Sequence, residues 1–105
     1  MNNINELINN NVTVDNEFVK ELVFGIITYQ NKIDEIANKH LKDWSLARLG
    51  FTDQAIIRIG IYELLYTEIP EIVAINEAIE LAKKYSDEDV RKMINSILDK
   101  IYHEK

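Results

Sequence analysis

Apolar residues recur every three or four positions through most of the chain, which is the spacing of an amphipathic helix, and no alternating strand pattern competes with them. The first stripe consists of large apolar residues: Phe18, Leu22, Ile26 and Tyr29. It predicts a helix over 15–30 that begins at the capping residue Asp15. A shorter stripe predicts a second helix over 32–42. Residues 1–12 are rich in asparagine, and we expect them to be weakly ordered.

The segment from Asp53 to about Thr67 is apolar around most of its circumference, which is typical of a central, buried helix. Gly60 lies inside it, where glycine costs about 1 kcal/mol relative to alanine. The close approach of a neighbouring helix would explain a glycine at this position. The connector before this helix holds large apolar groups and is expected to pack onto the core, and Thr52 is the candidate cap. Those groups are Trp44, Leu46, Leu49 and Phe51.

Two further helices are predicted in the last third of the chain, over 73–85 and 87–103. Pro70 separates the first of them from the central helix, and Ser86 begins a capping box ahead of the second. The sequence therefore predicts an all-α protein, a compact bundle of about five helices forming one domain over 1–105.

Composition narrows the possible chemistry. The chain has no cysteine and only two histidines, His40 and His103, which are far apart in the sequence, so no metal site or thiol chemistry is expected. No glycine-rich phosphate loop and no nucleophile with a nearby base is recognisable, so neither a cofactor nor an enzymatic activity is expected. No segment is long and apolar enough to span a membrane, and a cytoplasmic protein is expected.

The net charge of −6 argues against binding to nucleic acid by bulk electrostatics alone. The basic residues are nevertheless unevenly placed, since half of the twelve lie within 83–105. Four of them bracket the turn at Ser86: Lys83, Lys84, Arg91 and Lys92. They form either an ordinary solvated helix surface or a small patch that contacts phosphates.

Three blocks of sequence carry a resemblance to a known family. The central helix reads LGFTDQAIIRIGIYEL over 49–64, the next block reads VAINEAIELAK over 73–83, and the last reads DEDVRKMINSILDK over 87–100. In this order and spacing they resemble the NusB family of transcription antitermination factors, most strongly over 49–103. The resemblance implies two small helical bundles that share a long helix.

The resemblance also implies a function. NusB-like proteins bind the boxA element of nascent ribosomal-operon RNA together with NusE, a small-subunit ribosomal protein, within an RNA polymerase antitermination complex. Family members begin with an arginine-rich helix, whereas no Lys or Arg precedes Lys20 here. Without that basic helix, RNA binding is expected to be weak and to rest on the C-terminal surface, and the apolar face of the 15–30 helix is expected to be incompletely covered.

The family's motifs suggest five RNA-binding positions in this chain: Asp53, Arg58, Asp89, Arg91 and Lys92. Arg58 is alternatively a partner for a neighbouring acid. Met93 stands where the family commonly has an aromatic residue, and it lacks the ring that stacks on a base.

Two other functions remain open. The chain is alternatively a protein–protein interaction module, bound to NusE or to itself as a homodimer, without substantial RNA binding. NusB-like domains also occur at the start of ribosomal-RNA cytosine methyltransferases. Because the sequence ends at Lys105, it would be at most a detached accessory domain of such an enzyme.

Overall fold

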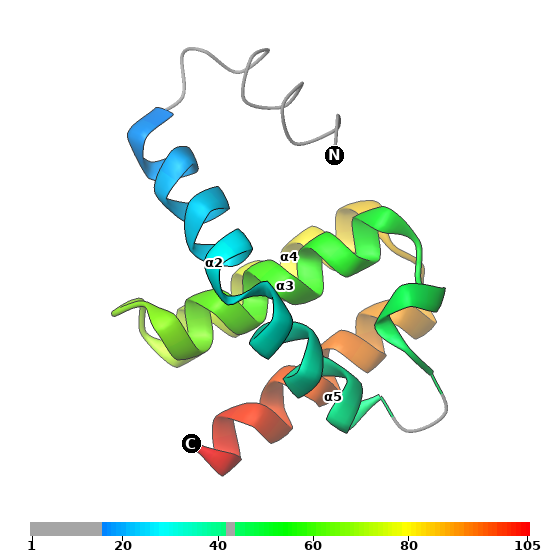
Figure 1. Cartoon of the computed structure of the whole chain (residues 1–105). Helices are drawn as coiled ribbons and strands as arrows, with labels where there is room; N and C mark the ends of the chain where they lie inside the picture. The colour runs from blue at the N-terminus through cyan, green and yellow to red at the C-terminus, as the bar shows by residue number, and fades with distance from the viewer. Residues whose placement is uncertain (1–15, 42–43) are drawn as a thin grey trace.

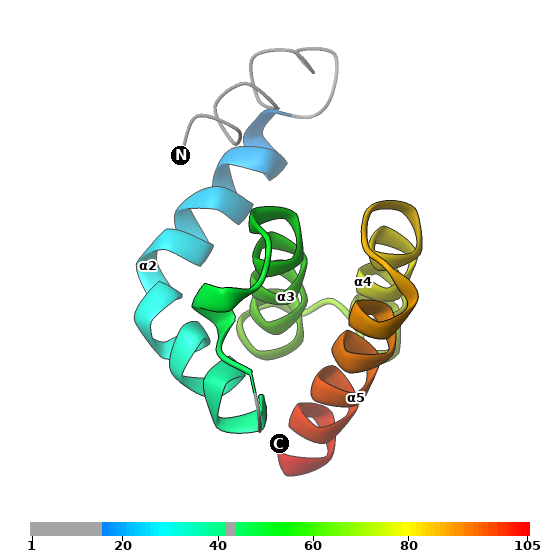
Figure 2. The same cartoon turned by 90° about the vertical axis from the view of Figure 1, so that its right-hand side faces the viewer.

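The computed structural model describes residues 16–41 and 44–105, and these form four α-helices and one short 3-10 turn (Figure 1). The weak ordering predicted for 1–12 and the cap predicted at Asp15 lie outside the described residues. Helix α3 (Phe51–Tyr66) lies in the middle. Helix α2 (Asn16–His40) lies on one side of it, and α4 (Glu71–Tyr85) and α5 (Glu88–Glu104) lie on the other (Figure 2). The described part of the chain is helical and contains no strand, which confirms the all-α prediction.

Helix α2 runs unbroken from Asn16 to His40, so the prediction of two helices over 15–30 and 32–42 is wrong. The polar residues between the two stripes, Gln30 to Lys32, are good or tolerable helix formers, and no proline interrupts them. The two apolar stripes are parts of one helix whose downstream half turns one face to the core, with Ile33 and Ala37 fully inaccessible to solvent.

The connector packs onto the core only in part. Its 3-10 turn, Leu46–Arg48, buries Leu46, and Leu49 is buried just after it. Trp44 and Phe51 stay 55% and 81% exposed, contrary to the expectation that all the large groups of the connector pack inward. Two of the four large groups, at and just after the turn, therefore fill the core, and the two at the outer ends of the connector face outward.

Helix α3, Phe51–Tyr66, is the buried central helix that the sequence predicts. The helix begins one residue before Thr52 and has Gly50 as its N-cap residue, so Thr52 does not cap it. A methyl group added at Gly60 would lie 3.0 Å from a methyl carbon of Leu98 and 3.3 Å from Cβ of Ala78. The glycine therefore allows α4 and α5 to approach α3 closely, as expected.

Helices α4, Glu71–Tyr85, and α5, Glu88–Glu104, form the other side of the core. The face of α4 that packs inward is a row of alanines four positions apart: Ala74, Ala78 and Ala82. The buried face of α5 carries larger groups: Ile94, Ile97, Leu98 and Ile101. Small side chains on α4 thus pair with large ones on α5, which fills the space between the helices.

The cap of α5 is Asp87, whose carboxylate accepts a hydrogen bond from the backbone N–H of Val90 at 2.9 Å. The predicted capping box at Ser86 is therefore wrong by one position. The Ser86 hydroxyl instead donates to the carboxylate of Asp53 on α3, so a tertiary contact takes the side chain away from the local cap.

Candidate nucleic-acid interface

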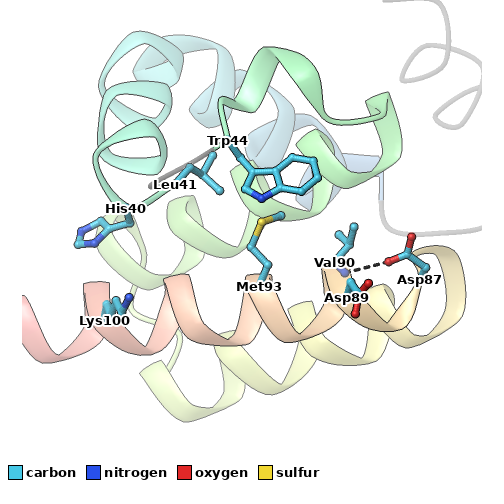
Figure 3. A pocket seen from close by; sticks show the side chains of 8 residues that line it. All are labelled: His40, Leu41, Trp44, Asp87, Asp89, Val90, Met93 and Lys100. Carbon is cyan, nitrogen blue, oxygen red and sulfur yellow. Dashed lines mark hydrogen bonds between the residues drawn. The ribbon is translucent and has the colours of Figure 1, made fainter.

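A pocket of about 510 Å³ lies between the end of α2, the connector and the face of α5 that runs as far as Lys100 (Figure 3). Leu41, Val90 and Met93 make its apolar lining. Residues with polar or aromatic groups complete it: His40, Trp44, Asp87, Asp89 and Lys100. The volume is in the range of about 300–1,000 Å³ found for small-molecule sites.

Of the five residues singled out by the sequence, Asp89 lines this pocket. Lys92, three positions further along α5, is exposed, and its ammonium forms no ion pair with any residue in the described part of the chain. Arg91 is paired within its own helix. Its guanidinium donates a hydrogen bond to the Glu88 carboxylate at 2.6 Å, and only 23% of the arginine side chain is exposed. That hydrogen bond lowers the pKa of the Glu88 carboxyl.

Asp53 lies in the first turn of α3 and accepts a hydrogen bond from Ser86 in the turn between α4 and α5. The contact ties the beginning of α3 to the beginning of α5. Asp53 is half-buried rather than presented to solvent. Its carboxylate therefore positions the segment that carries the pocket.

Arg58 faces α2 rather than the pocket. Its Nε and Nη2 atoms donate to the two carboxylate oxygens of Asp34, at 2.8 and 3.0 Å, and both side chains are about three-quarters buried. A bidentate pair of this kind is strong and directional. The structure thus shows the arrangement that the sequence left open as the alternative, with Arg58 paired to a neighbouring acid.

The basic residues near the turn at Ser86 do not form one uniform patch. Lys83 contacts Glu80 at 3.3 Å, and Lys84 lies 5.5 Å from the centre of the Tyr85 ring. Within 16–41 and 44–105, the α4 and α5 lysines without an ion pair are Lys84, Lys92 and Lys100. Two of these three lie on α5, where the pocket is.

Trp44 lines the pocket, although large apolar residues of the connector are expected to pack into the core. More than half of its surface is exposed. Figure 3 shows the Met93 side chain pointing toward the indole from α5. Only the packing of the connector against α5 brings the two residues together, since they are 49 positions apart in the sequence, and no local motif signals the contact.

One buried acid lies away from this surface. Glu63 on α3 is only 5% exposed, and burial, with a smaller effect of the Glu77 charge, raises the pKa of its carboxyl from 4.5 to about 7. The folded state therefore holds a proton that the unfolded chain releases between these two pH values. The stabilising effect of that proton is complete below pH 4.5 and is lost as the pH rises to about 7.

We therefore expect Glu63→Gln, which keeps the shape without the charge, to raise the free energy of unfolding at pH 8 by about 1–2 kcal/mol relative to the parent. At pH 5 the two proteins should be nearly equal. Urea unfolding at the two pH values measures this difference, and Glu68→Gln, on an exposed residue, is the control. An equal effect of Glu63→Gln at both pH values would show that the carboxyl is charged throughout.

In the described part of the chain, no helix is both long and apolar enough to cross a membrane. Nor does any group of three histidine, aspartate or glutamate side chains among residues 16–41 and 44–105 lie close enough together to hold a metal ion.

The sequence matches the NusB family model over residues 1–103. The chain belongs to the NusB family. The transcription antitermination protein NusB of Macrococcus caseolyticus is 48% identical over 88 residues, covering 84% of this chain and 68% of that protein. The family assignment made from the three sequence blocks is thereby confirmed.

Two solved structures of NusB proteins share the fold. T. maritima NusB is similar with a TM-score of 0.79 and 40% identity, over 85% of this chain and 63% of that one. A crystal structure of the antitermination factors NusB and NusE in complex with dsRNA is similar with a TM-score of 0.76 and 32% identity, over 86% of this chain and 67% of that one. The chain thus spans about two thirds of the length of these NusB proteins.

Proposed function

We propose that this NusB-family chain is a transcription antitermination factor that binds boxA-type ribosomal-operon RNA together with NusE and acts in an RNA polymerase antitermination complex in the bacterial cytoplasm. The observation that carries the proposal is the likeness to a NusB protein solved with NusE and RNA. The proposal assigns the chain binding and no catalysis.

The proposed RNA surface is the beginning of α5 and the pocket beside it. Lys92 offers an exposed ammonium for a phosphate, and Asp89 offers a carboxylate that accepts a hydrogen bond from a base edge. Arg91 is available only in part because of Glu88. Asp53 supports this surface through Ser86, whereas Arg58 pairs with Asp34 on α2, and neither side chain is assigned to the RNA itself.

The test is binding of a fluorescently labelled boxA-like single-stranded RNA, measured by anisotropy at several salt concentrations, with and without NusE. We expect tighter binding with NusE. Lys92→Ala should weaken binding and reduce the slope of log K against log salt by about 0.7, the value for one phosphate of a single strand. Lys32→Ala is the control, on an exposed α2 residue whose ammonium lies 4.0 Å from the Glu35 carboxylate.

If the chain binds no such RNA at low salt, alone or with NusE, the proposal is wrong. Equal effects of Lys92→Ala and Lys32→Ala would contradict the placement of the RNA on α5, because both remove one exposed charge.

The second candidate function, a protein–protein module, is favoured by the upstream half of α2. Phe24 and Ile27 there are 66% and 52% exposed, and large apolar groups so exposed on one helix are typical of an interaction site. The occupant would be NusE or a second copy of the chain. A chain that sediments as a monomer and does not bind NusE would exclude this candidate.

A further inference from the structure

Trp44 is held in place by its backbone although its ring is exposed. Its N–H donates to the Leu41 carbonyl at 3.2 Å. Two residues later, the Leu46 N–H donates to the side-chain oxygen of Asn38 at 2.8 Å, and Leu46 itself is buried. The backbone that carries the indole is therefore tied to Leu41, which follows α2, and two residues further on to Asn38 within α2.

The surroundings of the indole are those of a site for a flat, partly polar ring. On the opposite side of the pocket, Val90 and Met93 of α5 provide apolar surface (Figure 3). Hydrogen-bonding groups lie at the two ends, with Asp89 at one and Lys100 at the other. A nucleotide has these same parts, with the apolar faces and polar edge of its base and a phosphate on one side.

The polar groups of the lining favour a ligand with hydrogen-bonding groups over a purely apolar one. The ammonium of Lys100 forms no ion pair within the described residues and is available to a phosphate. Of the two acids, Asp87 already caps α5 by accepting a hydrogen bond from the Val90 N–H. The Asp89 carboxylate therefore remains as the acceptor for a base. The pocket also adjoins the α5 surface that carries Lys92.

We propose that this pocket receives one unstacked base of the single-stranded RNA, which stacks on the Trp44 indole, with Met93 on its other face and Lys100 beside its phosphate. Trp44 then supplies the aromatic ring that position 93 lacks. The proposal rests on the proposed function, and it adds a base-binding residue outside the five positions that the family motifs suggest.

Trp44 is the single tryptophan of the chain, so its fluorescence reports on the pocket directly. We expect the emission, excited at 295 nm, to be quenched as boxA-like RNA is added, with the same midpoint as the anisotropy of a labelled RNA. Because Trp44→Ala removes the ring on which the base stacks, it should weaken binding at least about tenfold. Trp44→Phe should restore most of the affinity, and Ile72→Ala, on an exposed apolar residue of α4, should leave it unchanged.

RNAs that carry a single abasic site at successive positions identify the base. Removing that base should weaken binding to the parent chain about tenfold and have little further effect on Trp44→Ala, because both changes delete the same contact. If the RNA binds but the tryptophan emission does not change and no abasic position is coupled to Trp44, the pocket proposal is overturned while the proposed function stands. If the RNA does not bind the parent chain at all, both the proposed function and the pocket proposal are wrong. Should Trp44→Ala fail to fold, the emission of the parent chain and Trp44→Phe decide the question.

Discussion

Replacing Arg58 by alanine is expected to destabilise the fold by about 2 kcal/mol. The substitution removes two hydrogen bonds to Asp34 and leaves that carboxylate three-quarters buried without its cation. Since the pair joins α2 to α3, the loss should appear in the free energy of unfolding measured in urea. The RNA affinity of the folded variant should change little compared with that of Lys92→Ala.

A double-mutant cycle with Asp34→Ala separates the two roles of Arg58. If the arginine acts through Asp34, the double variant should be about as stable as either single variant, since each one already breaks the pair. The contrary result is an Arg58→Ala protein with the parent's stability and a much weaker RNA complex. Arg58 would then be a phosphate contact, as the family motif suggests, and the ion pair would be incidental.

Gly60→Leu is expected to destabilise the protein by about 3 kcal/mol or to prevent folding. A first carbon at this position already lies 3.0 Å from Leu98 and 3.3 Å from Ala78, and leucine adds three more carbons to a space that both helices occupy. Circular dichroism should show a lower melting temperature or a loss of helix. The predicted cause is steric, because leucine is a better helix former than glycine.

Two further variants test that cause. Gly60→Ala adds one methyl group and gains about 1 kcal/mol of helix propensity, so the two effects should nearly cancel. Combining Gly60→Leu with Leu98→Ala should recover part of the lost stability, because the space vacated on α5 lies against the added side chain. If Leu98→Ala lowers the stability of Gly60→Leu further by its own cost, the steric clash is not with Leu98.

The sequence predicts most of the helical structure because helices depend on local periodicity. The central position of α3 follows from its apolar circumference, and the role of Gly60 follows from the cost of glycine inside a helix. The helix boundaries are less accurate where two signals compete. Asp87 and Ser86 are both good caps, and only the tertiary bond from Ser86 to Asp53 decides which of them serves as the cap.

The candidate site is harder to predict because its members come from distant segments. Asp89 and Lys92 follow from the family motif, but the partner of Arg58 is 24 positions upstream on a helix that the sequence divides in two. Trp44 is the clearest case. A large apolar residue in a connector is expected to be buried, and its exposure depends on how the short turn after it directs Leu46 and Leu49 into the core.

The unbroken course of α2 also sets distances within an assembly. Phe24 lies in its upstream half and Leu41, at the pocket, directly follows its last residue. Seventeen residues of helix correspond to about 25 Å. Because α2 is uninterrupted, a protein bound at Phe24 and a base bound at Trp44 would be held about this far apart. An RNA that contacts both the pocket and that protein must then span a fixed distance.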